Sequence, residues 1–512
     1  MTSDIVFYNG DILCVDEEFN IFSALAVKGN KIVQVGCIDD IKPLISSNTI
    51  TVDLQGRSVL PGFIDSHVHF TQTGLDEMAL DAGIYTNLPN LNSAIKEYAK
   101  NISEKEWIIV SSYNESKMGI DGLPDRWSLD ELKVNNPIFI SRLDAHSCSV
   151  NSKGFAKLNI EGDIDGVNKS HKEECNGIFT ATANGLARRR LTEEFSDERR
   201  KQAVNIACQK ALKVGITHVN AMEGGSLFND RDVKVLKNEA KNLPIGIKIF
   251  HQTIDVEEVL AEGFPRIGGC ITIDGSIGSL TAAFEEPYCI PPYSRGNLYY
   301  TDEEVNAFVQ FAHNKGLQIA THCIGDRAIE QMLKAYERCI DKNSTKDYRH
   351  RIEHFSIPKP EHIERAAALK LIISTQPAFD YYINDESFTK KLGNERIQRK
   401  TPLKSLLKKG ILIAGGSDSP VTPMNPLLGI YSSVNHWNKE ERLTVKESIK
   451  LFTINGAKAV FEERRRGTLE EGKIADLVVL SENPLSVDKQ RIKDIPVEMV
   501  VVGGEIKYEK AH

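Results

Sequence analysis

The sequence lacks the features that mark secreted, membrane-spanning or nucleic-acid-binding proteins. Its nine cysteines are an odd number and none follows a Cys-x-x-Cys spacing, so neither a disulfide framework nor a zinc knuckle is indicated. No apolar run approaches the roughly 20 residues needed to span a bilayer, and the first residues lack the basic segment and apolar core of a secretory signal. Lys and Arg total 63 against 71 Asp and Glu, without a long basic run. We therefore expect a cytoplasmic protein whose partner is neither nucleic acid nor a membrane.

Both ends of the 512-residue chain have the pattern of short β-strands. Residues 5–54 contain short alternating apolar runs separated by turn signals such as Asn9-Gly10 and Gly29-Asn30. Residues 475–480 and 497–502 have the same character, and the second run turns at Gly503-Gly504. We predict that residues 1–58 and 460–512 form one composite β-sandwich domain.

The central body, residues 59–459, alternates strand-like apolar runs with amphipathic helix patterns, which is typical of a parallel α/β fold. A long polar region at about 75–195 interrupts the alternation after the first strand and is interpreted as an insertion. The other strand candidates are 216–219, 245–250, 269–273, 317–322, 351–354, 371–374 and 411–414. Eight βα units predict a (β/α)8 TIM-like barrel, in which functional groups lie where the strands end.

The first of these strands lies in the apolar stretch that runs from Ser58 to Phe70. Side chains alternate between the two faces of a strand, so His67 and His69 share one face at its C-terminal end. Two imidazoles on one face can bind one metal ion. An isolated His-x-His pair is at least as often two core histidines satisfied by hydrogen bonds, so other residues must decide.

Three further polar side chains follow the same rule. His322 ends the fifth strand, His354 ends the sixth, and Asp418 follows the eighth. Singly, the histidines could belong to the core and Asp418 could cap the next segment. Together with His67 and His69 they form a ligand set suited to zinc or a similar divalent ion.

These segments carry a specific resemblance to a known family. They are Leu60-Pro-Gly-Phe-Ile-Asp-Ser-His-Val-His69, Asp144-Ala-His146-Ser, Asp274-Gly-Ser-Ile-Gly278, Thr321-His-Cys-Ile-Gly-Asp-Arg-Ala328, Arg349-His-Arg-Ile-Glu-His354 and Gly416-Ser-Asp-Ser-Pro420. The chain resembles the amidohydrolase superfamily over nearly its whole length, within it the YtcJ-like and N-substituted formamide deformylase-like branch, amidohydrolase family 3.

The resemblance implies a barrel with a composite β-sandwich and a metal centre that holds one or two ions. His67, His69 and Asp418 would bind one ion, and His322 and His354 a second. His146 matches a position that faces the substrate. Asp144 in the same motif, and Phe379, are expected to join it in binding the substrate. Trp107, Tyr113 and Tyr381 are further pocket candidates, although aromatic residues there could equally serve local packing.

One departure from the family concerns the bridging ligand. The resemblance implies a carbamylated lysine four residues before Asp274, and this sequence has Cys270 there. Because a thiolate is a good zinc ligand, Cys270 could bind or bridge the metal ions. The alternative is a buried free cysteine, which would leave the centre with one metal or none at full strength.

We predict a metal-dependent hydrolase that cleaves a non-peptide carbon–nitrogen bond of an amide or formamide. Its small-molecule substrate would be attacked by metal-activated hydroxide, with Asp418 as the catalytic proton shuttle. Isomerisation or decarboxylation on the same metal centre is one alternative, and a non-catalytic small-molecule sensor is another. A sensor has no need of a proton shuttle, so Asp418 favours an enzyme. Such barrels often form homodimers, and the sequence leaves the oligomeric state open.

Overall fold

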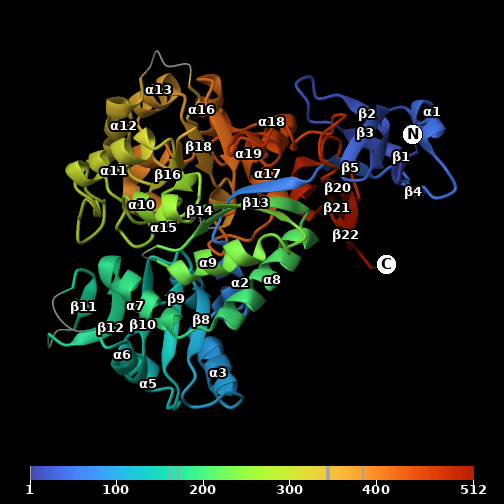
Figure 1. Ribbon diagram of the computed structural model, residues 1–512. Coiled ribbons are helices and arrows are strands. Elements are labelled where there is room, and N and C mark those ends of the chain that lie inside the picture. Colours follow the sequence, from blue (N-terminus) through green and yellow to red (C-terminus); the bar gives the residue numbers. More distant parts are fainter. Residues whose placement is uncertain are drawn as a thin grey trace.

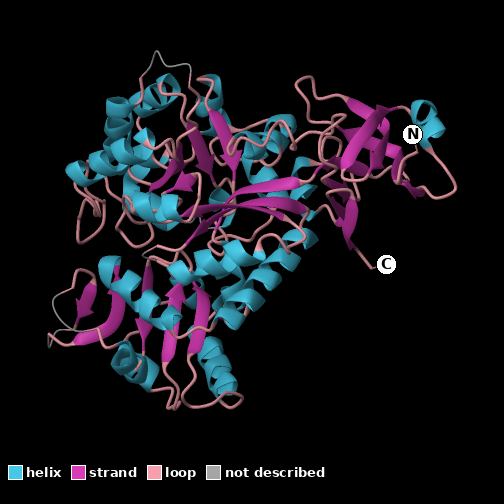
Figure 2. Ribbon diagram, viewed as in Figure 1, coloured by secondary structure: helices cyan, strands magenta, loops and turns pink. Residues whose placement is uncertain are grey.

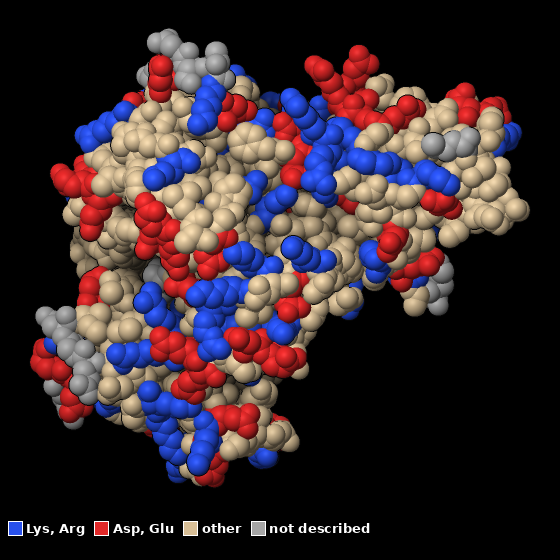
Figure 3. Space-filling view, viewed as in Figure 1, with Lys and Arg blue, Asp and Glu red and all other residues tan. Residues whose placement is uncertain are grey.

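The structure, a computed structural model, describes residues 2–120, 122–160, 164–170, 173–225, 227–341, 346–382 and 386–511. Within these residues the strands form three sheets, arranged as a central barrel, a sheet that contains both ends of the chain, and a separate lobe (Figures 1 and 2). None of the described helices combines the length and the apolar character needed to cross a membrane. Acidic and basic side chains are interspersed on the face shown in Figure 3.

The central sheet is a nearly closed barrel of eight parallel strands, as predicted. In sheet order they are β19 (Leu412–Gly415), β18 (Ile372–Thr375), β17 (Arg351–His354), β16 (Gln318–Cys323), β15 (Arg266–Ile267), β14 (Gly246–His251), β13 (Ile216–Glu223) and β6 (Phe63–Val68). The first and last strands meet just beyond their ends, where the Asp418 N–H donates a hydrogen bond of 2.7 Å to the His67 carbonyl oxygen. Six of the predicted strands match within one residue at their start.

Helices that follow the strands cover the outside of the barrel, except for two that lie at its mouth (Figure 2). They are α2 (Phe70–Glu77), α8 (Asp197–Lys213), α9 (Asp230–Glu239), α10 (Val256–Ala261), α11 (Asp302–Asn314), α12 (Asp326–Cys339), α13 (Pro360–Ala368), α14 (Phe379–Tyr382), α15 (Glu386–Ile397), α16 (Leu403–Lys408), α17 (Pro426–Val434), α18 (Val445–Leu451) and α19 (Ile454–Lys458). The two at the mouth are α14 and α15, which line a cavity there. Buried apolar side chains of the strands and of several of these helices form the largest core cluster.

The stretch from Ser58 to Phe70 serves two sheets rather than one. Its first half is β5 (Ser58–Pro61), which pairs with strands from both ends of the chain, and its second half is β6 of the barrel. Gly62 separates the two halves. A Cβ atom at this position would lie 2.2 Å from the Thr217 side chain, so only glycine fits.

The fourth barrel strand differs from the prediction of 269–273. It is only Arg266–Ile267, because Gly268 and Gly269 follow with φ angles of 89° and 56°, which turn the chain out of the strand conformation. The chain regains a single parallel bridge between Thr272 and His322. As a result, Cys270 lies just past the end of its strand, at the barrel mouth where His69 and Asp418 also lie.

Strands from both ends of the chain form the second sheet. Its order is β22 (Glu505–Glu509), β21 (Val497–Val502), β20 (Leu477–Leu480), β5, β1 (Ile5–Leu13), β2 (Ile21–Lys28) and β3 (Lys31–Gly36), with β4 (Ile50–Asp53) paired to β1. The short helix α1 (Ile38–Ile41) lies beside it. The more specific assignment of a β-sandwich stays a prediction.

The region predicted as an insertion folds into a lobe with a sheet of its own (Figure 1). The order of its strands is β11 (Val167–Lys169), β12 (Cys175–Thr180), β10 (Ser147–Val150), β9 (Ile138–Arg142), β8 (Ile108–Tyr113) and β7 (Leu80–Asp81). Its helices are α3 (Leu88–Ala99), α4 (Glu115–Met118), α5 (Arg126–Asp130), α6 (Ser152–Leu158) and α7 (Ala181–Glu193). This lobe places the loop after β9, with Asp144 and His146, over the barrel mouth.

Candidate metal centre

Six predicted ligand side chains meet at the C-terminal ends of the barrel strands. His67 lies in β6 and His69 directly after it, Cys270 follows β15, His322 lies in β16, His354 ends β17, and Asp418 follows β19. All six are buried. Their donor atoms form three groups in which every atom lies within 4.8 Å of the others; these are His67 with His69 and Cys270, Cys270 with His322 and His354, and His67 with His354 and Asp418.

Cys270 and Asp418 lie between the imidazoles. The Cys270 sulfur is 3.6 Å from His322 Nδ1 and 3.5 Å from His354 Nε2. Asp418 Oδ1 is 3.2 Å from His67 Nε2 and 3.1 Å from His69 Nε2. The thiol belongs to two of the three donor groups, as do His67 and His354, and it is the member that links the His67–His69 pair to the His322–His354 pair.

Each imidazole makes a hydrogen bond on the side away from the cluster. The His67 Nδ1 is 2.6 Å from the Glu353 carboxylate, the His69 Nδ1 is 3.0 Å from the Met222 carbonyl oxygen, and the His354 Nδ1 is 2.7 Å from Gln376 Oε1. The His322 Nε2 is 3.2 Å from the Gly275 carbonyl oxygen. Because all these partners accept hydrogen bonds, each imidazole in its neutral form would carry its proton on the outer nitrogen and leave the inner nitrogen free to bind a metal ion.

Two further observations show that this donor set fits a metal ion. Within the described part of the chain, His67 Nε2 and Asp418 Oδ1 are among the buried polar atoms that have no hydrogen-bond partner, although they lie 3.2 Å apart. Most buried polar atoms in proteins are paired. In addition, His354 and Asp418 have φ angles of 68° and 55°, a strained conformation for residues other than glycine that concentrates at functional sites.

The ionisation of the cluster also favours a cation. Burial alone would raise the pKa of the Cys270 thiol, but the neighbouring imidazoles outweigh burial and hold this pKa well below its ordinary value. Burial likewise opposes the charge of Asp418, and His67 and His69 lower the pKa of its carboxyl. The centre therefore offers a thiolate and a carboxylate among imidazoles, a set typical of zinc sites.

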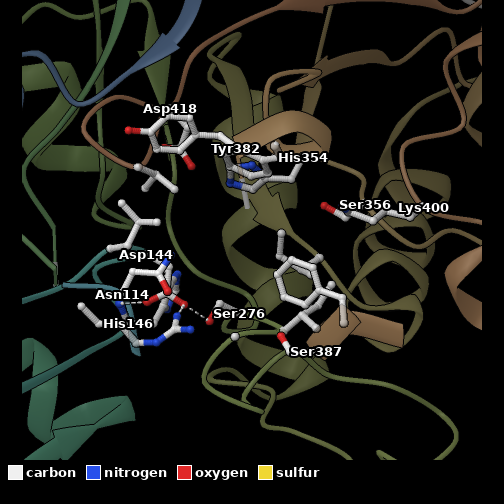
Figure 4. Close-up of a pocket in the computed structure, with 18 of the residues that line it drawn as sticks. Asn114, Asp144, His146, Ser276, His354, Ser356, Tyr382, Ser387, Lys400 and Asp418 are labelled. Carbon is white, nitrogen blue, oxygen red and sulfur yellow. Dashed lines mark hydrogen bonds and ion pairs between the residues drawn. The ribbon is translucent and has the colours of Figure 1, made fainter. Parts of the chain in front are cut away.

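A cavity of about 230 Å³ opens above the cluster, between the barrel and the lobe (Figure 4). Asp418, His322 and His354 line its barrel side, and all three predicted substrate-binding residues, Asp144, His146 and Phe379, line it as well. The His146 ring lies 5.5 Å from the His322 ring, and Phe379 stacks 6.2 Å from His354. Burial lowers the pKa of His146 to about 4, so this imidazole is neutral near pH 7.

Asp144 has more partners than the sequence suggested. Its carboxylate forms an ion pair with Arg142 and accepts a hydrogen bond of 2.6 Å from the Ser276 hydroxyl, and Arg142 also pairs with Glu115 at 2.6 Å. Figure 4 shows Asp144 beside Ser276, which belongs to the loop after β15. Asp144 thus ties the lobe to the barrel at the edge of the cavity, and its role in substrate binding stays a prediction.

Three aromatic pocket candidates were wrong. Tyr113 is fully buried within the core of the lobe, Trp107 packs beside another buried cluster there, and Tyr381 is 52% exposed outside the cavity lining. The neighbouring Tyr382 and Phe388 line the cavity instead. The sequence shows only that these aromatic residues lie in the lobe or after a barrel strand. It does not show which face of the lobe or of α14 each ring occupies.

The sequence reasoning also missed several polar residues around the cavity. Lys400 lines it and lies 2.7 Å from the buried Asp380 carboxylate, which in turn lies 2.8 Å from His436 Nε2. Arg142 and Ser276 were missed because their importance depends on contacts between distant segments. Glu353 carried a usable signal, since it alternates with Arg351 on a strand that ends in a ligand.

Comparison with known proteins agrees with this geometry. The model of the amidohydrolase family matches residues 51–508. The amidohydrolase YtcJ of Bacillus subtilis is 30% identical over 99% of both chains, and the N-substituted formamide deformylase of Arthrobacter pascens is 22% identical over 99% of this chain and 98% of its own. The crystal structure of an uncharacterized metal-dependent hydrolase from Pyrococcus horikoshii superposes with a TM-score of 0.78 at 25% identity, covering 95% of this chain and 99% of that one.

Proposed function

This chain belongs to the amidohydrolase family, and from that premise we propose that it hydrolyses a linear amide or formamide with two zinc ions. It is a metal-dependent hydrolase and an enzyme that acts on amide-type carbon–nitrogen bonds. The choice of a formamide or small amide is supported by the likeness to the Arthrobacter pascens deformylase, which acts on N-substituted formamides as its name states.

The observation that carries this proposal is the cluster of six buried donors at the cavity floor. His67, His69 and Asp418 would hold one ion, and His322 and His354 the other. Cys270 groups with His67 and His69 on one side and with His322 and His354 on the other, so we assign it the bridging position that a carbamylated lysine would otherwise fill. Thiolate coordination suits zinc better than the harder magnesium or calcium ions.

When bound, the ions supply Lewis acidity, which favours attack by water on a carbonyl carbon. Asp418 both contacts His67 and His69 and lines the cavity, so its carboxylate can accept a proton from the attacking water. The new carbon–oxygen bond forms, the carbon–nitrogen bond breaks, and Asp418 hands the proton to the leaving nitrogen. The products are a carboxylic acid and an amine.

The lobe completes the cavity around the substrate. The neutral His146 ring faces the cluster from the opposite wall and can donate a hydrogen bond to the carbonyl oxygen. The remaining lining includes polar residues such as Asn114 and Lys400, and an apolar part formed by Ile277, Ile324, Phe379 and Phe388. We infer that the substrate is a small amide whose nitrogen substituent is apolar and about the size of an aromatic ring.

Turnover of a panel of N-substituted formamides and small amides by zinc-loaded protein tests this proposal. We expect hydrolysis of at least one formamide with an apolar nitrogen substituent. Asp418→Asn should lower kcat by at least about 100-fold, because proton transfer by a positioned group contributes this much or more. Circular dichroism should show that the variant keeps its fold. Absence of turnover across the panel, or an active Asp418→Asn variant, would contradict the assignment.

A further inference from the structure

Two charged side chains lie inside the barrel directly beneath the ligand cluster. Arg351 and Glu353 are both on β17, where they alternate with the apolar Ile352 and therefore share one face of the strand. Both side chains are fully buried, with 0% exposure. Ions in a protein core cost several kcal/mol each to desolvate, and apolar side chains of similar size would fill the same space without this cost.

The pair makes a continuous chain of hydrogen bonds that ends at His67. Arg351 donates from Nε to Glu353 Oε1 at 2.7 Å and from Nη2 to Glu353 Oε2 at 2.7 Å, a two-point contact. The same Nη2 donates to the Ser66 carbonyl oxygen at 2.7 Å. Glu353 Oε2 then accepts from His67 Nδ1 at 2.6 Å. This arrangement leaves His67 Nε2 directed toward His69 and Asp418.

The carboxylate partner Glu353 distinguishes His67 from the other histidines of the cluster. His69 and His322 donate to backbone carbonyl oxygens, and His354 donates to the side-chain amide of Gln376. Asp274 lies 3.6 Å from His322, but its carboxylate accepts hydrogen bonds from the backbone of Ala283, Ile324 and Gly325. Among these four, only His67 has a carboxylate at hydrogen-bonding distance on the side that faces away from the cluster.

We propose that Arg351 and Glu353 are positioning residues that set the affinity of the ion held by His67. The carboxylate fixes the His67 ring and its Nδ1–H tautomer, and Arg351 fixes the carboxylate, so that Nε2 faces the ion without adjustment. The inference rests on the proposed function, because it requires an ion at the cluster. It adds an asymmetry, in which the ion on the His67 side depends on a charged partner and the ion on the His322 side does not.

Zinc affinity of the full-length metal-free protein, measured by competition with a chromophoric chelator, tests the proposal. Glu353→Gln keeps the size of the side chain but removes its charge. We expect one of the two ions to bind about 10- to 100-fold more weakly, the range for lost ligand-supporting partners, with the other unchanged. In Arg351→Lys, Glu353 keeps its contact with His67 but loses the two hydrogen bonds that Arg351 donates to its carboxylate. We expect the binding of the same ion to weaken by a smaller factor.

Asp232→Asn is the matched control. Asp232 forms a buried ion pair of 2.6 Å with Arg200, nearly as enclosed as the Arg351–Glu353 pair, and its described hydrogen bonds and ion pairs involve no ligand histidine. Its loss should lower thermal stability and leave zinc affinity unchanged. If Glu353→Gln and Arg351→Lys bind both ions as wild type does, or if Asp232→Asn weakens zinc equally, the positioning role is wrong. A wild-type chain that binds no zinc would overturn the proposed function itself, and this inference with it.

Discussion

The two walls of the cavity use polar residues in opposite ways. On the barrel side, His67 Nε2 and Asp418 Oδ1 are buried without a hydrogen-bond partner in the described structure. On the lobe side, the carboxylate of Asp144 is engaged by Arg142 and Ser276. On the barrel side, unpaired donors that face the cavity can bind a metal ion. On the lobe side, charges that neutralise one another hold the shape of the cavity wall. The chemistry thus belongs to the barrel, and the lobe supplies closure and fit.

The largest effect on this contrast is expected from removing Cys270, the proposed bridging donor of the barrel wall. Cys270→Ser replaces a thiolate with a hydroxyl, a much poorer zinc ligand near neutral pH. We expect the metal content to fall by one ion per chain and the activity to fall by roughly 100-fold or more, since the Lewis-acid contribution is lost. Plasma mass spectrometry and initial rates measure the two effects.

Cys208→Ser is the control for this substitution, because Cys208 is equally buried but lies in α8. It should retain both ions. Unchanged metal content and activity in Cys270→Ser would show that Cys270 is a bystander of the core.

A change of pH should act on the barrel wall alone. Burial opposes a charge on His69, but Asp418 and Cys270 outweigh it and raise the pKa of this imidazole to about 9 in the metal-free chain. Zinc binds the neutral imidazole, so below pH 9 it must displace a proton. Burial also opposes a charge on His67, which is assigned to the same ion, but Cys270 and Asp418 raise the pKa of His67 well above its ordinary value. Zinc affinity should therefore fall by at least about tenfold for each pH unit from 8 to 6. Chelator competition at several pH values measures this slope, and an affinity independent of pH would contradict it.

Removing the polar ring of the lobe wall should have a smaller effect. His146→Ala deletes the imidazole that faces the cluster. Among the predicted ligands, this imidazole has a ring contact with His322. We expect kcat/KM to fall by about tenfold, as for one lost hydrogen bond to the substrate, while metal content stays at the wild-type value. Loss of metal in this variant would place His146 among the ligands instead.

The smallest effect is expected from the tie between lobe and barrel. Asp144→Asn removes the ion pair with Arg142, although Arg142 keeps Glu115 as a partner. We expect a loss of about 1–3 kcal/mol in the free energy of unfolding, measured with urea, and an activity within about tenfold of wild type. A larger loss of activity at constant stability would instead assign Asp144 to substrate binding.

Much of the barrel could be predicted from the sequence, since strand periodicity and helix patterns are local. Five of the six predicted ligands followed from one rule, that polar side chains at strand ends meet at one mouth, whereas Cys270 came from the family resemblance. The end of β15 could not be placed, because the two glycines after it act through left-handed backbone conformations that no apolar pattern reveals. The hydrogen bond from His67 to Glu353 joins residues 286 positions apart and required the closed barrel. The ties of Asp144 to Ser276 needed the position of the lobe as well.

The metal content of wild-type protein, purified without chelators or added metal and measured by plasma mass spectrometry, tests the central claim most directly. The six-donor cluster with a shared thiolate predicts close to two zinc ions per chain. A protein that holds no ion, even after zinc is offered at neutral pH, would contradict the assignment of these residues as a metal centre.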